Sequence, residues 1–356
     1  MRVLIMAGGT GGHVMPALAV AEELRAQGHS VSWLGTAAGL EARAVPTAGI
    51  ELFTLPVAGL RNQGLGRYLT APFTLLRALG QAIRLLRRLR PDVVLGLGGY
   101  AAGPGGLAAF LLRQPLLIHE QNARPGLTNR LLARFAQRVL AGFPGLRLGG
   151  RPAEFSGNPV RSTLFSLATP SERPGNPPHL LVLGGSQGAH AINQAVPAAL
   201  ALVAQAGLPL PQVRHQAGER HTQQVAADYA ARGIPAKVDG FIDDMPAAYG
   251  AADIAICRAG ALTIAELCAV GLGALLVPYP HAADDHQTAN AQYLVDAGAA
   301  ILIAQRDLNP QRLAELLKPL LADPMPRLGM AQAARRLAQP EAARRVASAC
   351  LELAHA

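Results

Sequence analysis

The chain has 356 residues, of which 50% are hydrophobic and 4% aromatic, and its net charge is +9. This length predicts about two domains of ~150 residues, and the scarcity of aromatic rings disfavours binding of single-stranded nucleic acid, which needs stacking platforms. The three cysteines, Cys257, Cys268 and Cys350, form no metal-ligand pattern and are expected to be reduced, buried residues of a cytosolic protein.

The N-terminus is predicted to form a strand that leads into a glycine-rich loop and then a helix. Residues 3–13 read VLIMAGGTGGH, and the helical pattern near 16–27 ends at Gly28. This order of elements places phosphates at a helix N-terminus in nucleotide-binding folds. An NAD-binding fold also needs an acidic residue at the end of the second strand, here 31–35, and Glu41 comes too late. NAD binding is therefore disfavoured, and an opening strand also disfavours a signal peptide.

His13 stands at the predicted start of this helix. The helix dipole disfavours a positive charge there, so we expect a neutral imidazole. A neutral imidazole in a cleft can accept a proton, which makes His13 a candidate general base. The alternative is that His13 only caps the helix. The turn itself needs no histidine, because Ala189 occupies the aligned position in a second glycine loop.

An arginine-rich region without acidic residues covers 61–90 and contains seven arginines. Residues 68–90 form an amphipathic helical pattern with one apolar stripe and a separate basic face. The stripe includes Leu76 and Leu79, and the basic face carries Arg77, Arg84 and Arg88. The pattern favours attachment to an anionic membrane surface. The alternative is a solvated face on a packed helix.

Two further strands, 92–98 and 115–120, are each predicted to end in a ligand loop. The first leads into a glycine-rich loop at 98–106, whose backbone N–H groups are suited to a pyrophosphate. The second ends in four consecutive polar residues, HEQN, which are costly at the end of a buried strand unless they face a site. Asn122 is suited to sugar hydroxyls, and His119 and Glu120 alternatively only hold the loop together. The candidates for acceptor or pyrophosphate contacts are Gly99, Tyr100, Gly103, Gly105, His119 and Glu120.

The second half repeats the opening pattern. Residues 180–190 read LLVLGGSQGAH, so Gly184, Gly185, Ser186 and Gly188 match the glycines and threonine of the first loop. Two such loops predict an α/β fold with two Rossmann-like domains facing across a cleft. The predicted domains are 1–160 and 161–337, with a helix at about 338–356 docking back on the first. The later predicted strands are 212–218, 236–242, 253–258 and 274–280, and one or two helices cover 326–354.

No transmembrane helix is predicted. Residues 191–213 carry no charge, but they contain three prolines and a glycine, which fits a helix followed by a loop.

The second half also contains residues suited to a nucleotide sugar. A loop at 258–263 joins a strand to a helix, and Glu266 lies one turn inside, where a carboxylate can hold a ribose diol. Ser186 and Arg161 offer a hydroxyl and a positive charge to phosphates, and Gln287 offers a donor and an acceptor to sugar hydroxyls. The Asp284-Asp285 pair lacks the pattern of a metal site. Loop N–H groups and arginine can neutralise a leaving diphosphate instead, so no metal or cofactor is expected.

These motifs resemble those of the MurG-type N-acetylglucosaminyltransferases of bacterial cell-wall synthesis. The matching segments span nearly the whole chain, in order, and are 8–21, 98–106, 119–129, 157–161, 184–190, 241–245, 257–266 and 286–291. The resemblance implies a GT-B fold and transfer of GlcNAc, with inversion, from UDP-GlcNAc to the C4 hydroxyl of undecaprenyl-pyrophosphoryl-MurNAc-pentapeptide. The product is lipid II. It further implies a peripheral enzyme at the cytoplasmic face of the inner membrane, partnered by other cell-wall synthesis proteins.

By position, the resemblance also implies a donor site for UDP-GlcNAc. From the first half these residues are Thr10, Gly11, Gly12 and Asn122, and from the second Arg161, Ser186, Ile242, Ala261, Leu262, Thr263, Ile264, Ala265, Glu266 and Gln287. Ile242 would pack beside the uracil, Glu266 would hold the ribose, and His13 is the acid/base candidate. The roles of His281 and of Asp284 to His286 stay open.

Two other interpretations remain. A UDP-GlcNAc 2-epimerase of the same fold would need no lipid acceptor, which would leave the arginine-rich region unexplained. A non-catalytic nucleotide-sugar sensor would explain the donor loops but not His13. Binding to membranes separates the transferase from the epimerase, and turnover separates both from the sensor.

Overall fold

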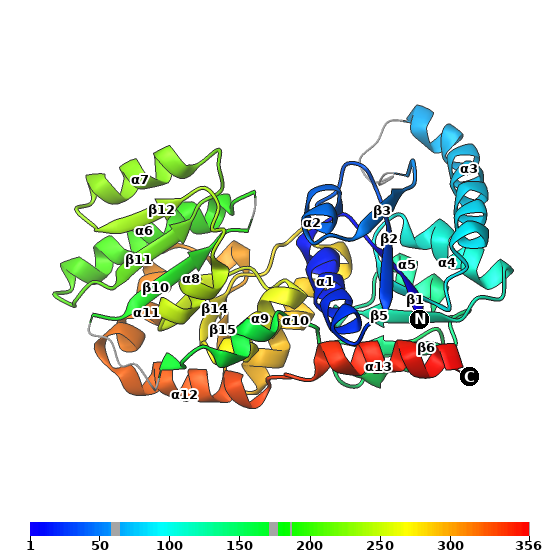
Figure 1. Ribbon diagram of the computed structural model, residues 1–356. Helices are drawn as coiled ribbons and strands as arrows, with labels where there is room; N and C mark the ends of the chain where they lie inside the picture. The colour runs from blue at the N-terminus through cyan, green and yellow to red at the C-terminus, as the bar shows by residue number, and fades with distance from the viewer. Residues whose placement is uncertain (58–64, 171–176, 186, 356) are drawn as a thin grey trace. The chain divides into compact units, whose positions relative to one another are not determined.

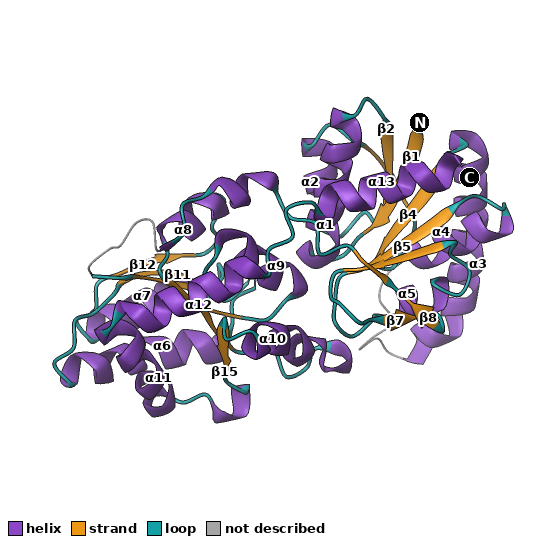
Figure 2. Cartoon of the chain, turned by 90° about the horizontal axis from the view of Figure 1, so that it is seen from below, coloured by secondary structure: helices purple, strands orange, loops and turns teal. Residues whose placement is uncertain are grey.

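The computed structural model describes residues 1–57, 65–170, 177–185 and 187–355 (Figure 1). Contacts between Cα atoms divide the chain into two compact units. The N-terminal unit comprises 1–161 and 339–356, and the C-terminal unit comprises 162–338. Each unit is built on its own parallel sheet covered by helices (Figure 2).

The sheet of the N-terminal unit has the order β3-β2-β1-β4-β5-β6-β9, with all neighbours parallel. Its strands are β1 (Arg2–Ala7), β2 (Ser30–Gly35), β3 (Glu51–Thr54), β4 (Val93–Gly98), β5 (Leu116–Glu120), β6 (Arg138–Ala141) and β9 (Glu154–Phe155). A small antiparallel pair, β7 (Arg147–Leu148) and β8 (Arg151–Pro152), lies outside this sheet. The strands β4 and β5 are buried along their whole length, because helices cover both faces of a parallel sheet.

Two core clusters lie on the opposite faces of this sheet. Val3 and Ile5 of β1 pack with α1 and α13, whereas Leu4 and Met6 pack with α3 and α4, since alternate side chains of a strand point to opposite faces. The helix α13 contacts α1 and the strands β4 and β5 (Figure 1). The helices of this unit are α1 (Gly11–Ala26), α2 (Glu41–Thr47), α3 (Leu65–Leu89), α4 (Ala102–Leu111), α5 (Leu127–Leu132) and α13 (Ala342–His355).

The sheet of the C-terminal unit has the order β12-β11-β10-β13-β14-β15, again parallel throughout. Its strands are β10 (His179–Leu183), β11 (Gln212–Gln216), β12 (Ala236–Asp239), β13 (Ile254–Cys257), β14 (Ala274–Leu276) and β15 (Ala300–Leu302). Its helices are α6 (His190–Gln205), α7 (Thr222–Ala231), α8 (Met245–Ala251), α9 (Ala261–Val270), α10 (His286–Asp296), α11 (Pro310–Ala322) and α12 (Pro324–Arg336).

The predicted strands of both halves are confirmed, and the last predicted segment forms two helices, α12 and α13. The structure adds three edge strands that were not predicted, β3, β9 and β15. All three are short and at most partly buried, so none has the continuous apolar run of a central strand. Among the described helices, none combines the length and the apolar content needed to cross a membrane.

Candidate functional site

The loops after β1 and β4 pack directly against each other in the N-terminal unit. Gly99 has a φ of 89°, and a Cβ atom on it would lie 2.4 Å from the carbonyl oxygen of Gly8. Only glycine fits such a close approach of two backbones. The strands β1 and β4 are neighbours in the sheet, so their carboxyl ends bring these two loops together at one edge.

The Glu41 carboxylate accepts a hydrogen bond from the backbone of the first glycine loop. This buried carboxylate accepts hydrogen bonds from the N–H of Gly9 at 2.9 Å, from the N–H of Thr36 at 2.8 Å and from the Thr36 hydroxyl at 2.6 Å. The N–H of Gly9 is therefore paired with a carboxylate of the same unit.

The helix α1 begins earlier than expected, at Gly11, so Gly11, Gly12 and His13 form its first turn. Thr10 is the N-cap residue and makes no side-chain cap. The first N–H groups of such a helix attract anions. The Nδ1 of His13 lies 2.9 Å from Oε1 of Gln121, in the loop that follows β5.

His119 and Glu120 are buried and bonded within their own loop. The Glu120 carboxylate accepts from the N–H of Asn122 at 2.9 Å, the N–H of Gly126 at 3.2 Å and the side chain of Asn129 at 2.9 Å. Of the two alternatives for these residues, the structure favours the one in which they hold the loop. Asn122 itself is partly exposed.

The prediction of a loop over 98–106 is wrong from Ala102 onward, where α4 begins. Gly103 and Gly105 are therefore helical. A Cβ atom on Gly105 would lie 2.4 Å from the sulfur of Met6, so this glycine allows the helix to approach the sheet. Gly99 and Tyr100 stay in the loop, and Tyr100 is 52% exposed.

The second glycine loop, after β10, repeats the close packing of the first. Gly188 has a φ of 77°, and a Cβ atom on it would lie 2.0 Å from the carbonyl oxygen of Ala217, which follows β11. The loop therefore needs glycine for steric reasons as well as for any ligand. Ser186 lies outside the described residues.

In the C-terminal unit, the N-terminus of α9 has no side-chain cap. The helix begins at Ala261, and its N-cap residue, Gly260, offers no side chain to the first N–H groups. These donors and the helix dipole favour an anion. Thr263 lies in the first turn, and Glu266 follows on the next turn; both are partly buried.

Tyr249 positions the Glu266 carboxylate. The hydroxyl of this buried α8 residue donates to Oε2 of Glu266 at 3.0 Å. Tyr249 was not predicted from the sequence, because α8 lies on a separate segment and no motif connects it to α9.

Gln287 joins two loops in the first turn of α10. Its Oε1 accepts from the N–H of Tyr279 at 2.9 Å and from the N–H of Ala259 at 3.3 Å. The carbonyl group of this side chain therefore holds backbone, and its amide N–H groups are the part suited to a sugar hydroxyl. Ile242 is buried between β12 and α8. Arg161 is the last residue of the 1–161 part of the N-terminal unit, one position beyond the predicted boundary at 160.

No cluster of three or more His, Cys, Asp or Glu side chains that could hold a metal occurs in the described part of the chain. Asp284 and Asp285 have φ angles of 53° and 52°, and Asp285 accepts a hydrogen bond from the Thr288 hydroxyl at 2.6 Å.

Arg258 donates to the carbonyl oxygen of Val277 at 3.0 Å and to Gln305 at 2.7 Å, so this arginine joins loops of its own unit.

The chain matches two models of one protein family. The glycosyltransferase family 28 N-terminal domain matches residues 3–141, and the glycosyltransferase family 28 C-terminal domain matches residues 179–346. The chain belongs to glycosyltransferase family 28. This family-28 glycosyltransferase has the GT-B fold, as the resemblance implied.

Two relatives match over nearly their full length. The UDP-N-acetylglucosamine–N-acetylmuramyl-(pentapeptide) pyrophosphoryl-undecaprenol N-acetylglucosamine transferases of Alkalilimnicola ehrlichii and Nitrosococcus oceani are 60% and 56% identical to it, and each alignment covers 99% of both chains. The crystal structure of Acinetobacter baumannii MurG superposes with a TM-score of 0.83 at 41% identity and covers 99% of both chains. The predicted resemblance to MurG-type transferases is confirmed.

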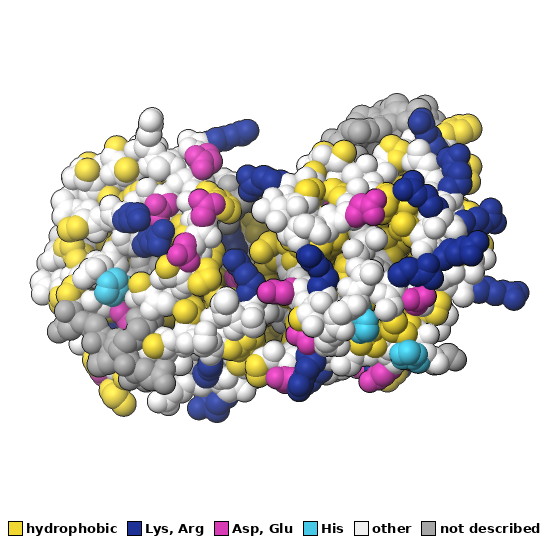
Figure 3. Space-filling view, viewed as in Figure 1, with side chains coloured by type: hydrophobic (Ala, Val, Ile, Leu, Met, Phe, Trp, Pro, Cys, Tyr) yellow, Lys and Arg dark blue, Asp and Glu magenta, His cyan; other side chains and the backbone are white. Residues whose placement is uncertain are grey.

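The surface of the family-28 glycosyltransferase near α3 differs from the predicted apolar stripe. Phe73, Leu75 and Leu76 are 76%, 48% and 66% exposed, whereas Leu79 packs against the core with Ala82 and Leu86. Leu79 is only partly buried, so it exposes less apolar surface than Leu76 does. Arg77, Arg84 and Arg88 are exposed, and Figure 3 shows basic side chains gathered on the edge of this unit along which α3 runs.

Further exposed apolar side chains come from α4 and α5. These side chains were not predicted from the sequence to lie on the surface. They are Phe110, Leu111, Leu127 and Leu131. The helix α4 contacts both α3 and α5. Apolar residues from three neighbouring helices of this unit thus reach the surface.

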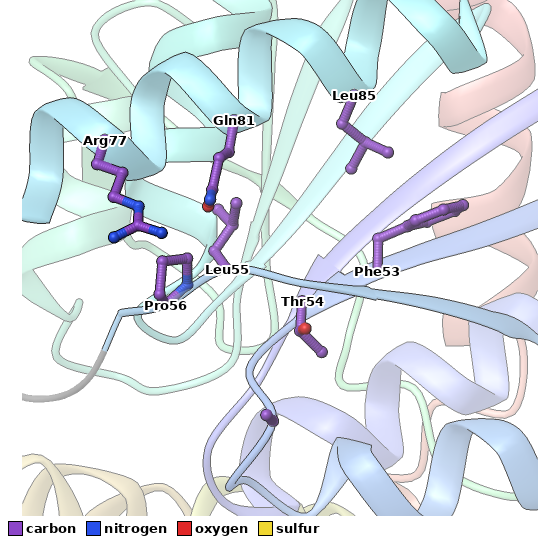
Figure 4. Close-up of a pocket in the computed structure, with 8 residues that line it drawn as sticks. Phe53, Thr54, Leu55, Pro56, Arg77, Gln81 and Leu85 are labelled. Carbon is purple, nitrogen blue, oxygen red and sulfur yellow. The ribbon is translucent and has the colours of Figure 1, made fainter.

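A pocket of about 480 Å³ lies between the end of β3 and α3 (Figure 4). Phe53, Leu55 and Leu85 supply apolar walls, and Arg77 and Gln81 extend from α3 toward the segment that follows β3. The pocket therefore combines an apolar lining with one guanidinium group on the basic helix.

Proposed function

We propose that this family-28 glycosyltransferase transfers GlcNAc from UDP-GlcNAc to the C4 hydroxyl of the muramyl sugar of undecaprenyl-pyrophosphoryl-MurNAc-pentapeptide. The products are lipid II and UDP, and the step serves peptidoglycan synthesis. The observation that carries the proposal is the full-length identity of 60% to a transferase named for these substrates. An epimerase would make no use of a lipid acceptor, so it is the weaker alternative.

The C-terminal unit supplies most of the proposed donor site. The N-terminus of α9, with Thr263 in its first turn, binds the diphosphate, and Ser186 contributes a hydroxyl group to the same ligand. The carboxylate of Glu266, held by Tyr249, accepts hydrogen bonds from the ribose hydroxyls. Ile242 packs beside the uracil and binds it through the Ile242 backbone. The side-chain amide of Gln287 donates hydrogen bonds to the sugar.

The remaining proposed donor contacts come from the N-terminal unit. They are Thr10, Gly11 and Gly12 at the start of α1, Asn122 after β5, and Arg161 at the end of the unit. Their polar groups are of the kind that bind phosphate oxygens and sugar hydroxyls.

The proposed reaction is a single displacement with inversion. The acceptor C4 oxygen attacks the anomeric carbon of GlcNAc while His13 removes the hydroxyl proton, and the bond from that carbon to the diphosphate oxygen breaks as UDP leaves. Backbone N–H groups at α9 and the Arg161 guanidinium stabilise the negative charge that develops on the diphosphate. We propose that no metal is required, because these groups supply the neutralisation.

The test is release of UDP from UDP-GlcNAc, measured in EDTA with and without a short-chain lipid-linked MurNAc-pentapeptide. We expect release only with the acceptor. Release without acceptor would indicate a hydrolysing epimerase and overturn the proposal. Binding of UDP-GlcNAc with no release in either tube, before or after Mg²⁺ is added, would indicate a sensor.

We further propose that the enzyme binds the cytoplasmic face of the inner membrane through the surface near α3. Phe73 and Leu76 would enter the interface, while Arg77, Arg84 and Arg88 pair with anionic headgroups. The exposed apolar residues of α4 and α5 extend this surface. A peripheral enzyme of this kind reaches a lipid-linked acceptor without crossing the membrane, and other cell-wall synthesis proteins are proposed partners there.

Replacing Arg77, Arg84 and Arg88 by serine is expected to weaken partitioning into anionic vesicles by about 150-fold, because each of the three arginines contributes about 1 kcal/mol near such a surface. Sedimentation with vesicles of anionic and neutral lipids measures the effect. The matched control replaces Arg232, Arg306 and Arg312, exposed arginines of the C-terminal unit, and removes the same charge. Equal partitioning of the two triple variants would make the α3 face solvated surface only.

A further inference from the structure

His13 is the end of a chain of hydrogen bonds that continues into the core of the N-terminal unit. Its Nδ1 lies 2.9 Å from Oε1 of Gln121. The Nε2 of Gln121 lies 3.0 Å from Nδ1 of His119, and the Nε2 of His119 lies 3.1 Å from the carbonyl oxygen of Gly157. Gln121 and His119 are buried, so these bonds are shielded from exchange with water.

The buried end of the chain determines the protonation of His119. The carbonyl oxygen of Gly157 can only accept, so the Nε2 of His119 carries a hydrogen. The Ser156 oxygen, 3.1 Å from the same nitrogen, also accepts, because the serine hydroxyl donates to a carbonyl oxygen, that of Gly157 or Ala141. Burial lowers the pKa of His119 to about 4, so the ring is neutral and its Nδ1 presents a lone pair.

The orientation of the Gln121 amide follows. Its Nε2 donates to Nδ1 of His119 and lies 3.1 Å from the His119 carbonyl oxygen, which can only accept. The backbone of Gln121 is held as well, because the side chain of Asn158 donates to its carbonyl oxygen at 2.9 Å. The Oε1 atom therefore faces His13 and can only accept, so the Nδ1 of His13 carries the hydrogen.

We propose that Gln121 and His119 are positioning residues that hold His13 in the tautomer protonated on Nδ1. In this tautomer the Nε2 of His13 has a free lone pair and can remove a proton, whereas in the other tautomer Nε2 would be a donor. The catalytic purpose of this arrangement rests on the proposed function, in which His13 is the base. The bonding pattern itself does not depend on any activity.

The first test is ¹⁵N NMR of the full chain with labelled histidines at about pH 8, where a histidine of ordinary pKa is neutral. The His13 signals are assigned from their loss in His13→Gln. We expect a protonated Nδ1 and an unprotonated Nε2 in the wild-type protein. A His13 protonated on Nε2 would overturn the proposal, and this measurement needs no variant of the positioning residues.

The second test compares Gln121→Met, which keeps the size but removes the acceptor, with Gln121→Glu, which keeps an acceptor oxygen. We expect Gln121→Met to shift His13 toward the Nε2-protonated form and to lower kcat about 10- to 100-fold, with KM for UDP-GlcNAc unchanged. Gln121→Glu is expected to recover part of kcat. Equal kcat in Gln121→Met and the wild-type protein would overturn the proposal.

These measurements separate this proposal from the proposed function. If His13→Ala turns over normally while the wild-type ring is protonated on Nδ1, His13 is not the base, although the hydrogen-bond chain is as assigned. If His13→Ala is inactive and the wild-type ring is protonated on Nε2, His13 is still supported as the base. The positioning role of Gln121 and His119 is then refuted. Should Gln121→Met not fold, Gln121→Asn replaces it, because its shorter side chain withdraws the acceptor oxygen from His13.

Discussion

Replacing His13 by alanine is expected to lower kcat by about 100-fold or more, because the acceptor hydroxyl loses the group that removes its proton. The affinity for UDP-GlcNAc should change little, since the structure holds the imidazole through Gln121 and the donor contacts proposed above lie elsewhere. Steady-state turnover with saturating acceptor measures kcat, and calorimetry with UDP-GlcNAc measures binding.

The matched control for His13→Ala is His355→Ala, the same change at an exposed position of α13 in the same unit. It should leave both quantities at the wild-type value. Turnover of His13→Ala within a few-fold of the wild-type protein would remove His13 from the mechanism and leave it as a polar residue of the first helical turn.

Replacing Glu266 by alanine is expected to weaken UDP binding by about 1.5–3 kcal/mol, which is about 10- to 150-fold, through loss of a charge-assisted hydrogen bond to the ribose. Calorimetry with UDP measures the change. The loss should be specific to the ribose hydroxyls. UDP lacking both hydroxyls should therefore bind the wild-type and Glu266→Ala proteins with equal affinity.

Two further variants test the origin of this effect. Tyr249→Phe keeps the Glu266 carboxylate but removes the hydrogen bond that orients it, so we expect a smaller loss of about 1 kcal/mol. Glu315→Ala removes a carboxylate from the exposed surface of α11 and should not change UDP binding. Unaltered UDP affinity in Glu266→Ala would refute the ribose role.

The apolar runs of the central strands made the parallel sheets predictable. Strands such as β4 and β5 are buried on both faces, so their sequences are continuously apolar and end at polar or glycine-rich loops. The edge strand β3 has two exposed residues out of four, and its pattern does not differ from that of a loop. For β3, prediction failed because the strand lacks that burial.

In α3, helical periodicity did not predict which residues of the apolar stripe are buried. The spacing of Leu76 and Leu79 assigned both to one stripe, but Leu79 packs against the core and Leu76 is 66% exposed. The periodicity shows which side chains share one side of the helix. Whether each of them is buried depends on which other elements pack against the helix at that point along its length. Those elements, β3 and α4, come from other segments of the chain.

The sequence by itself determined the two glycine loops, the family and the identity of the candidate residues, because these depend on local motifs whose steric and chemical needs are readable from residue type. Only the tertiary structure decided what those residues contact. Gly105 packs a helix on Met6, Glu41 takes the N–H of Gly9, and His13 meets Gln121 across 108 positions of sequence. Such partners are set by the register of neighbouring strands, which brings distant loops to one edge of the sheet.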